Sequence, residues 1–287
     1  MIVKIAEHAG ACYGVERALK MVLNTAQELQ DDCQNGAQNN TMHTLGPLIH
    51  NPQVVASLEK QGVHVAHSAQ DVQEGTVVIR THGVPPNIIE ELNAKHLDII
   101  DATCPYVKKV HKAAKKLALE GYFILIVGDA DHAEVEGISG YSGTRFAIVK
   151  SLEDLKALDL PNKLGVVVQT TQSQSILQEL VGYLISHASE VRVYNTICEA
   201  TEERQKAAAE LSRTVDVMIV IGGKNSGNTK RLFEISKEYC EHTYHIEVAD
   251  ELKLSWFEGV STVGVTAGAS TPASQIDNVV KVLESIA

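Results

Sequence analysis

Three cysteines, Cys12, Cys104 and Cys198, divide the 287-residue chain into nearly equal thirds. The intervals are 92 residues, from 12 to 104, and 94 residues, from 104 to 198. Each cysteine follows a short apolar run and precedes a helical pattern with apolar residues three and four apart. This regularity indicates a threefold internal repeat. Such a repeat can bring the three thiolates to one point, where they would bind a metal centre.

The residues around the cysteines favour thiolate chemistry. Pro105 follows Cys104 directly, and proline is favoured at the first position of a helix. We therefore expect Cys104 at a helix N-cap, with Cys12 and Cys198 in comparable places, where the helix dipole lowers thiol pKa values. No CxxC pair typical of structural zinc occurs. A catalytic zinc with three thiolate ligands and an iron–sulfur cluster with three protein ligands both fit this spacing.

The two other cysteines, Cys33 and Cys240, lack the repeated context, and we interpret them as uninvolved in the metal site. Cys33 lies in a polar run, DDCQNGAQNN, that lengthens the first copy of the repeat and is predicted to be a surface insertion. Five is an odd number of cysteines, and in a chain expected in the cytosol it argues against a disulfide framework.

A second set of candidates consists of polar residues that follow predicted strands. Short hydroxyl and amide side chains, together with backbone amides at helix starts, suit phosphate oxygens, and imidazoles add positive charge near an anion. Neither GxxxxGK[ST] nor a GxGxxG after the first strand is present, so we expect no built-in ATP, NAD or flavin site. The set is His50, His82, His132, Glu134, Thr170, Thr171, Asn225, Ser226, Asn228 and Ser270.

Glu134 has the most specific chemical meaning in this set. It lies two residues after His132, in a loop expected to face the metal centre. A carboxyl group in a partly desolvated pocket holds its proton near neutral pH and can act as a general acid. The neighbouring Glu136 is the better candidate for a solvated surface glutamate.

The elements between these residues predict the fold class. Strand, polar loop and helix recur in the same order in each copy, which indicates an α/β fold with mostly parallel sheets and covering helices. We expect three α/β units related by a pseudo-threefold axis around the central thiolate site, and ligands of open α/β sheets bind at the carboxyl ends of strands. The expected units are residues 14–103, residues 104–197, and residues 198–287 together with 1–13.

Composition and charge exclude several classes of function. The formal net charge of −11 argues against sequence-independent binding to nucleic acid or to an anionic membrane surface. No run of about 18 apolar residues predicts a membrane span. The N-terminal sequence lacks the features of a signal peptide, so the cytoplasm is the expected location.

With these residues in view, the chain closely resembles the 4-hydroxy-3-methylbut-2-enyl diphosphate reductase (LytB) family nearly end to end. The resemblance implies a [4Fe–4S] cluster bound by Cys12, Cys104 and Cys198, with the fourth iron open to an allylic diphosphate substrate. It also implies two-electron removal of the substrate hydroxyl, with electrons from a separate ferredoxin or flavodoxin. The motifs that carry it are GACYGVERA, LIHN, THGV, DATCPYVKKVH, HAEVEG, QTTQS, CEATEERQ, KNSGNTKRL and VTAGAS.

The same resemblance implies roles for the polar residues. Glu134 would supply protons with help from Thr170, and His132 would lie near the reacting carbon chain and the diphosphate. The residues implied to hold the diphosphate are His50, His82, Ser226, Asn228 and Ser270. One departure matters, because Gly227 stands where many relatives have serine and its backbone amide must replace a hydroxyl donor. The alternatives from the residues alone are a three-thiolate zinc hydrolase and a non-catalytic module that binds a phosphate ligand.

Overall fold

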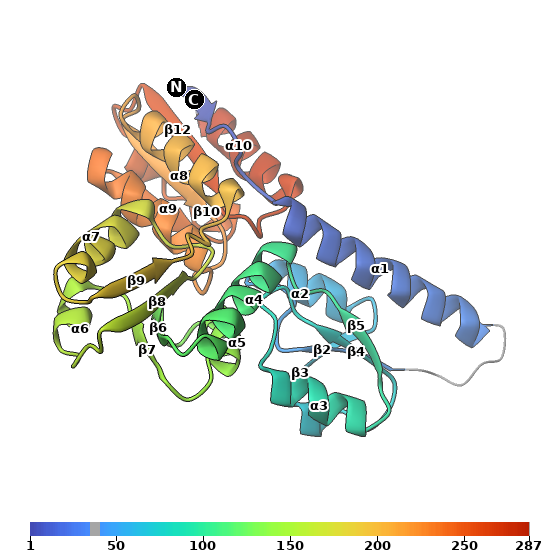
Figure 1. The fold of residues 1–287 in the computed structure, drawn as a ribbon. Coiled ribbons are helices and arrows are strands. Elements are labelled where there is room, and N and C mark those ends of the chain that lie inside the picture. The colour runs from blue at the N-terminus through green and yellow to red at the C-terminus, as the bar shows by residue number, and fades with distance from the viewer. Residues whose placement is uncertain (35–40, 287) are drawn as a thin grey trace. The chain divides into compact units, whose positions relative to one another are not determined.

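The computed structural model of the chain describes residues 1–34 and 41–286. Within these residues the strands form three four-stranded sheets, and every strand pair in them is parallel. Helices alternate with the strands along the chain (Figure 1). The prediction of three α/β units with parallel sheets is therefore confirmed.

The three sheets share one strand order, which is the structural form of the sequence repeat. Their orders are β3-β2-β4-β5, β7-β6-β8-β9 and β11-β10-β12-β1. The first strand of the chain thus takes the edge position in the last sheet that β5 and β9 take in the other two. The strands are β1 (Ile2–Ile5), β2 (Met42–Leu45), β3 (Val63–Ala66), β4 (Thr76–Ile79), β5 (Asp98–Asp101), β6 (Phe123–Val127), β7 (Phe146–Val149), β8 (Lys163–Val168), β9 (Glu190–Val193), β10 (Val217–Ile221), β11 (Thr243–Ile246) and β12 (Thr262–Ala267).

The helices begin at residues that favour helix starts. Pro105 opens α4, and the hydroxyls of Ser151, Ser173 and Ser226 accept backbone N–H groups at the starts of α6, α7 and α9. The α-helices are α1 (Tyr13–Gln34), α2 (Pro52–Glu59), α3 (Pro86–Ala94), α4 (Pro105–Leu119), α5 (Ala133–Tyr141), α6 (Leu152–Lys156), α7 (Gln174–Ile185), α8 (Glu199–Ser212), α9 (Gly227–Tyr239) and α10 (Ala273–Ile286). Three short 3₁₀ helices, at 69–71, 249–251 and 254–257, complete the described elements.

Each sheet is buried because its central strands are almost wholly apolar. All five residues of β10 are buried, as are all four of β4 and five of the six in β8. Strands covered on both faces read as continuous apolar runs rather than alternating ones. Apolar side chains of the flanking helices complete a separate core for each sheet.

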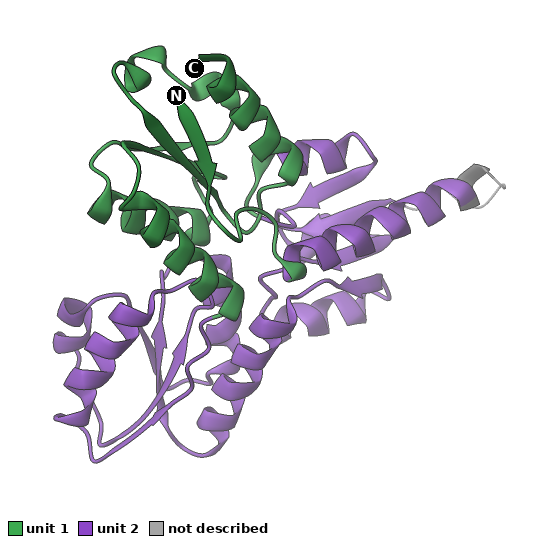
Figure 2. Cartoon of the chain, turned by 90° about the horizontal axis from the view of Figure 1, so that it is seen from above, with its two compact units in different colours: residues 1–13, 50–52, 198–287 green, residues 14–49, 53–197 purple. Residues whose placement is uncertain are grey.

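By contact the chain divides into two compact units (Figure 2). Unit 1 consists of residues 1–13, 50–52 and 198–287, and unit 2 of residues 14–49 and 53–197. Unit 1 contains the sheet of β10, and unit 2 contains the other two sheets. Among the described residues, no helix combines the length and apolar character needed to cross a membrane.

The shared strand order also fixes where ligand-binding loops lie. In the sheets of β2 and β6 the chain leaves one central strand toward one edge and returns through the other central strand toward the opposite edge. In the sheet of β10 the strand at that opposite edge is β1, so all three sheets have the same topological switch point. The central pairs are β2 with β4, β6 with β8, and β10 with β12. The candidate polar residues follow these six strands at their carboxyl ends, whereas the three repeated cysteines follow the edge strands β1, β5 and β9.

Candidate functional site

The three repeated cysteines lie at the starts of helices. Cys104 is the N-cap of α4 and Cys198 is the N-cap of α8, while Cys12 directly precedes α1. This confirms the prediction of helix N-terminal positions. Neither Cys104 nor Cys198 caps its helix through the thiol, and all three residues are partly exposed. Thiolate character is favoured at such positions, so the donor set fits a thiolate-bound metal group.

The remaining cysteines are in different surroundings. Cys240 is buried, its thiol lies 3.5 Å from the carbonyl oxygen of Asp216, and burial raises its pKa. A thiol of this kind is inert. Cys33 lies near the end of α1, where its side chain falls outside the described residues, and so do residues 35–40 of the predicted insertion.

In unit 1, a buried arginine ties the Cys12 segment to the helix that begins after Cys198. Arg204 of α8 donates from Nε and Nη2 to the carbonyl oxygen of Gly10, at 3.2 and 2.8 Å. The Cys12 amide donates to the carbonyl oxygen of Ala269, in the loop after β12. Two candidate ligands of this unit are therefore fixed to the same framework by hydrogen bonds.

In unit 2, the Cys104 segment is bonded in the same way to the turn that carries His82. The Cys104 amide donates to the carbonyl oxygen of Thr81, at 3.0 Å. Thr81 in turn donates from its amide and its hydroxyl to the carbonyl oxygen of Leu48. The backbone that leads into α4 is thereby fixed against the loops after β2 and β4.

Glu134 is a buried carboxyl group held by one residue of a neighbouring loop. Its side chain is 2% exposed. The Thr170 amide donates to Oε1 at 2.6 Å, and the Thr170 hydroxyl donates to Oε2 at 2.8 Å. Burial raises the pKa of Glu134 to about 7, although both Thr170 hydrogen bonds oppose the rise by favouring the ionised form. The carboxyl group is thus able to hold and release a proton near neutral pH.

His132 is the N-cap of the helix that carries Glu134, and this contact defines its tautomer. Nδ1 accepts the Glu134 amide at 3.1 Å. Burial lowers the pKa of His132 to about 4, so the ring is neutral at physiological pH and Nε2 carries the proton. The ring of His82 meets it edge to face, with centroids 5.3 Å apart and planes at 84°. Unit 2 thus brings His82, His132, Glu134 and Thr170 together.

His111, on α4, fills the space between the His82 turn and the helix that carries Glu134. It is 6% exposed and stacks on Tyr141 with ring centroids 4.4 Å apart. A Cβ on Gly83 would lie 2.6 Å from its Cε1, and one on Gly137 would lie 3.1 Å from its Nε2. Burial lowers the pKa of His111 to about 4, so the ring is uncharged at neutral pH and serves as a packing residue. We infer that it positions the two segments against each other.

The contact between Gly83 and His111 gives a stability prediction. Gly83→Ala places a side chain at φ +71° and against the imidazole, so it should lower the free energy of unfolding by roughly 2–3 kcal/mol in chemical denaturation. Gly62→Ala is the matched control, because Gly62 has φ +83° with no atom within 4 Å of the added Cβ. In that variant the free energy of unfolding should fall only by the cost of the strained backbone, about 1 kcal/mol. Equal losses of unfolding free energy in the two variants would mean that His111 moves aside without cost and does not hold the two segments in place.

An ion pair joins the same two segments at the surface. Arg80, two residues before His82, donates to Glu136 Oε2 at 3.1 Å. The Glu136 side chain is 62% exposed, as expected for a solvated glutamate. A pair in which one partner is largely exposed adds little stability, and this one links the segment after β4 to α5.

The loops of unit 1 join His50 and Asn51 to the loop after β12. Asn51 donates from Nδ2 to the carbonyl oxygen of Ser270 at 2.9 Å and to Gln275 Oε1 at 3.0 Å. The Ser270 hydroxyl donates to the carbonyl oxygen of His50 at 3.2 Å. This carbonyl also lies against the Cα of Gly223, where any side chain would collide with it. Glycine is therefore required by the close approach of two backbones.

Ser226, the N-cap of α9, and Asn228, in the first turn of that helix, have different local roles. The Ser226 hydroxyl caps α9 by accepting the Thr229 amide at 3.3 Å. Asn228 is 3% exposed, and within the described part of the chain neither Nδ2 nor Oδ1 has a hydrogen-bond partner. Buried amides are normally satisfied, so this side chain is suited to a bound ligand. Gly227 opens α9, where the first backbone N–H groups have no intrahelical acceptor.

Two further predicted residues are placed without an evident ligand role. The Thr171 hydroxyl accepts a hydrogen bond from Gln169 Nε2 at 3.0 Å. Asn225 is exposed in the loop before α9. Both positions are compatible with loop stabilisation alone.

Comparison with known proteins places this arrangement in one family. The model of the LytB protein family matches residues 3–284. The chain belongs to the LytB family. One relative, the 4-hydroxy-3-methylbut-2-enyl diphosphate reductase of Pelobacter propionicus, is 48% identical over 97% of this chain and 96% of its own. The corresponding reductase of Aquifex aeolicus is 46% identical over 98% of this chain and 96% of its own.

Two solved structures share the fold. One is an (E)-4-hydroxy-3-methyl-but-2-enyl diphosphate reductase, described as the terminal enzyme of the non-mevalonate pathway, with 46% identity and a TM-score of 0.70. It matches 99% of this chain and 100% of its own. The other, the E-1-hydroxy-2-methyl-but-2-enyl-4-diphosphate reductase from Plasmodium falciparum, has 29% identity and a TM-score of 0.89 over 98% of this chain and 87% of its own.

Sequence reasoning assigned no role to several residues that position the site in this LytB-family chain. Arg204 lies in the CEATEERQ run and His111 ends the DATCPYVKKVH run, so both belong to motifs that carry the resemblance. The role of Arg204 depends on the Gly10 carbonyl, which is 194 residues away in the chain. The role of His111 depends on Gly83 and Gly137, which lie against its ring. Arg204 lies four residues before the buried Ala208 on α8, and this spacing is the signal that could have placed it on the buried face.

Proposed function

We propose that this chain is a 4-hydroxy-3-methylbut-2-enyl diphosphate reductase. It converts (E)-4-hydroxy-3-methylbut-2-enyl diphosphate to isopentenyl diphosphate and dimethylallyl diphosphate. In the balanced reaction the C–OH bond breaks, a C–H bond forms, and two electrons and two protons are consumed with release of water. The observation in this molecule that supports the proposal best is Glu134, a buried carboxyl group with a pKa of about 7 in a chain of this family.

The proposed cofactor is a [4Fe–4S] cluster held by Cys12, Cys104 and Cys198. Three thiols at helix N-termini fit such a group, and the cluster would supply electrons and an open iron for the substrate hydroxyl. The family relationship supports a metal cofactor in general, and the cluster type is our proposal. Electrons would come from a separate ferredoxin or flavodoxin.

The protein's own residues would bind the diphosphate and move protons. Glu134 in its protonated form donates, and Thr170 holds its carboxyl group in place through the two hydrogen bonds. His132 presents Nε2–H as a neutral donor. We assign substrate binding to His50, His82, His132, Thr170, Ser226, Gly227, Asn228 and Ser270.

Anaerobic purification followed by iron, sulfide and zinc analysis tests the cofactor. Turnover of the allylic diphosphate with reduced methyl viologen, read as formation of the two products, tests the reaction. Stoichiometric zinc without sulfide would favour a three-thiolate hydrolase instead. Tight binding of the diphosphate without turnover in cofactor-loaded protein would favour a non-catalytic binding module.

Asn228→Ala should separate ligand binding from stability. The amide has no partner among the described residues, so its removal should leave the melting temperature of the substrate-free protein unchanged or slightly higher. Loss of a hydrogen bond to a charged phosphate should raise KM roughly tenfold to a hundredfold. Asn225→Ala is the control, because this asparagine lies three residues earlier and is exposed, and it should change neither quantity. A lower melting temperature with wild-type KM would assign Asn228 to the fold.

A further inference from the structure

The helix that begins at Cys104 is the most basic element described in an acidic protein. The chain contains 25 Lys and Arg against 36 Asp and Glu, yet α4 contains five lysines and no acidic residue. Lys108 forms an ion pair with Asp101 at 2.6 Å. Lys109, Lys112, Lys115 and Lys116 are exposed, and within the described chain none of the four has an acidic partner. We refer to these four residues as the lysine face.

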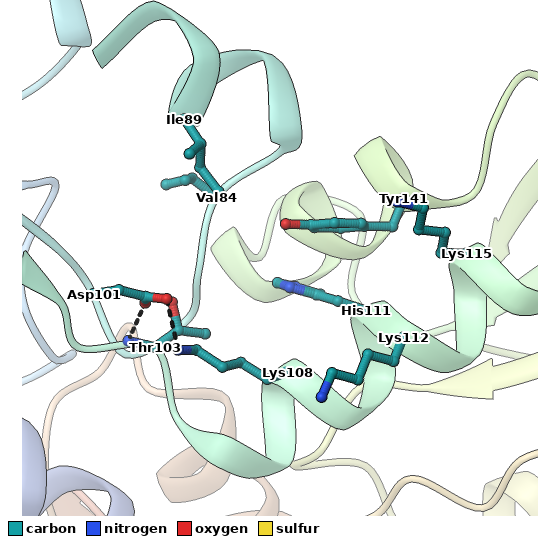
Figure 3. A pocket seen from close by; sticks show the side chains of 9 residues that line it. All are labelled: Val84, Ile89, Asp101, Thr103, Lys108, His111, Lys112, Lys115 and Tyr141. Atoms are coloured by element: carbon teal, nitrogen blue, oxygen red, sulfur yellow. Dashed lines mark hydrogen bonds and ion pairs between the residues drawn. The ribbon is translucent and has the colours of Figure 1, made fainter. Parts of the chain in front are cut away.

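Two pockets lie along this helix, and two residues of the lysine face, Lys112 and Lys115, line them. The first has a volume of about 300 Å³ and the second of about 520 Å³, and Lys115 and Tyr141 line both. Figure 3 shows the first pocket, with Tyr141 stacked on His111 and Lys108 turned toward Asp101. The second adds Arg145 and Leu119, whose side chain is 80% exposed. The lining of both pockets is mostly apolar, and Lys112, Lys115 and Arg145 add positive charge to it.

The length of the lysine face and the charges around the two pockets suit a protein better than a small anion. Lys109 and Lys116 are seven residues apart, about 10 Å along a helix, which exceeds the size of one phosphate. Exposed lysines bind a single small anion weakly. The Asp101 carboxylate also lines the first pocket and would repel a phosphate there. Complementary charge around an exposed apolar centre is typical of a docking surface for another protein.

The position of the lysine face at the helix of Cys104 points to one class of partner. We propose that the lysine face of α4 is the docking surface for an acidic electron-carrier protein of the ferredoxin or flavodoxin type. This inference rests on the proposed function. Two reduced carrier molecules each lose one electron, and these two electrons with two protons convert the substrate's C–OH to C–H and water. The rest of the surface carries net negative charge and repels an acidic carrier, so the lysine face steers it.

The test is a charge reversal at the centre of the face, Lys112→Glu with Lys115→Glu. With a reduced acidic flavodoxin as the probe at low salt, kcat/KM for the carrier should fall at least about tenfold. The wild-type value should fall steeply as salt is raised, whereas the variant should respond weakly. Turnover with reduced methyl viologen should stay at the wild-type level, because a small donor does not need the surface.

Lys237→Glu with Lys281→Glu is the matched control, since it changes the net charge equally at exposed lysines of α9 and α10. It should keep wild-type kinetics with flavodoxin.

Wild-type kcat/KM for flavodoxin in the α4 variant would overturn the proposal. So would loss of inorganic pyrophosphate binding in that variant with unchanged flavodoxin kinetics, which would indicate a small-anion site. A change in sedimentation with unchanged flavodoxin kinetics would indicate self-association. If the wild type fails to turn over with methyl viologen, the proposed function fails instead.

Discussion

Replacing Glu134 by glutamine is expected to lower kcat by about 10² to 10⁴, the usual contribution of a positioned general acid. Glutamine keeps the volume of the side chain and can still accept the Thr170 amide at Oε1. Its Nε2 can donate to the Thr170 hydroxyl, so the local structure should survive. The variant therefore removes the proton while leaving the cofactor content and substrate KM close to wild type. Single-turnover and steady-state rates of the cofactor-loaded enzyme measure the effect.

The pH dependence provides a second signature of Glu134. Its pKa is raised to about 7 by burial, so the proton is present below that pH and is lost above it. The kcat of the wild type should fall about tenfold per unit on the alkaline side, and the glutamine variant should lack this limb. Thr170→Val removes the hydroxyl that favours the ionised form. The pKa should then rise, and the limb should move to higher pH.

Glu136→Gln is the matched control, because Glu136 lies on the same helix but is exposed. It should lose only the ion pair with Arg80 and keep kcat and the alkaline limb. Wild-type turnover in Glu134→Gln would remove Glu134 as the proton source. A loss of cofactor in that variant would indicate a structural role instead.

The sequence was sufficient to predict the repeat, the parallel sheets and the loops that carry the site. Apolar runs at equal spacing from Cys12, Cys104 and Cys198 encode strands whose order then follows from the short connections of α/β units. Helix starts were predictable for a local reason, since Pro105 restricts the backbone of the residue before it. These features depend on neighbours in the chain, which a sequence displays directly.

The features that escaped prediction depend on partners that are distant in the chain. The Arg204 bond to the Gly10 carbonyl spans 194 residues, and the Asn51 bond to the Ser270 carbonyl spans 219. The sequence also could not distinguish hydroxyls used by the fold from side chains open to a ligand. Ser226 and Asn228 are two residues apart and equally polar, yet one caps a helix and the other has unsatisfied buried atoms. Only the geometry at the start of α9 separates them.

Cys104→Ser is expected to abolish nearly all binding of iron and sulfide without harming the fold. Serine is a preferred N-cap residue, and the Cys104 thiol does not cap α4. The free energy of unfolding of the cofactor-free protein should therefore stay the same or rise by about 0.5–1 kcal/mol. Anaerobic metal and sulfide analysis, together with denaturation of cofactor-free protein, measures the two quantities. Cys240→Ser is the control and should keep the wild-type metal content.

A loss of bound metal without a loss of folding stability is the result that identifies Cys104 as a ligand. A structural cysteine replaced by serine loses stability first, and the cofactor is lost only because the fold is weakened. At Cys104 the hydroxyl can satisfy the helix start, but at neutral pH it does not ionise as a thiol does, so it is a poor ligand for iron. Metal loss with undiminished stability would therefore come from the missing thiolate alone. Retained iron and sulfide in Cys104→Ser would exclude this thiol as an essential ligand, and with it the reason for placing the carrier's docking surface on α4.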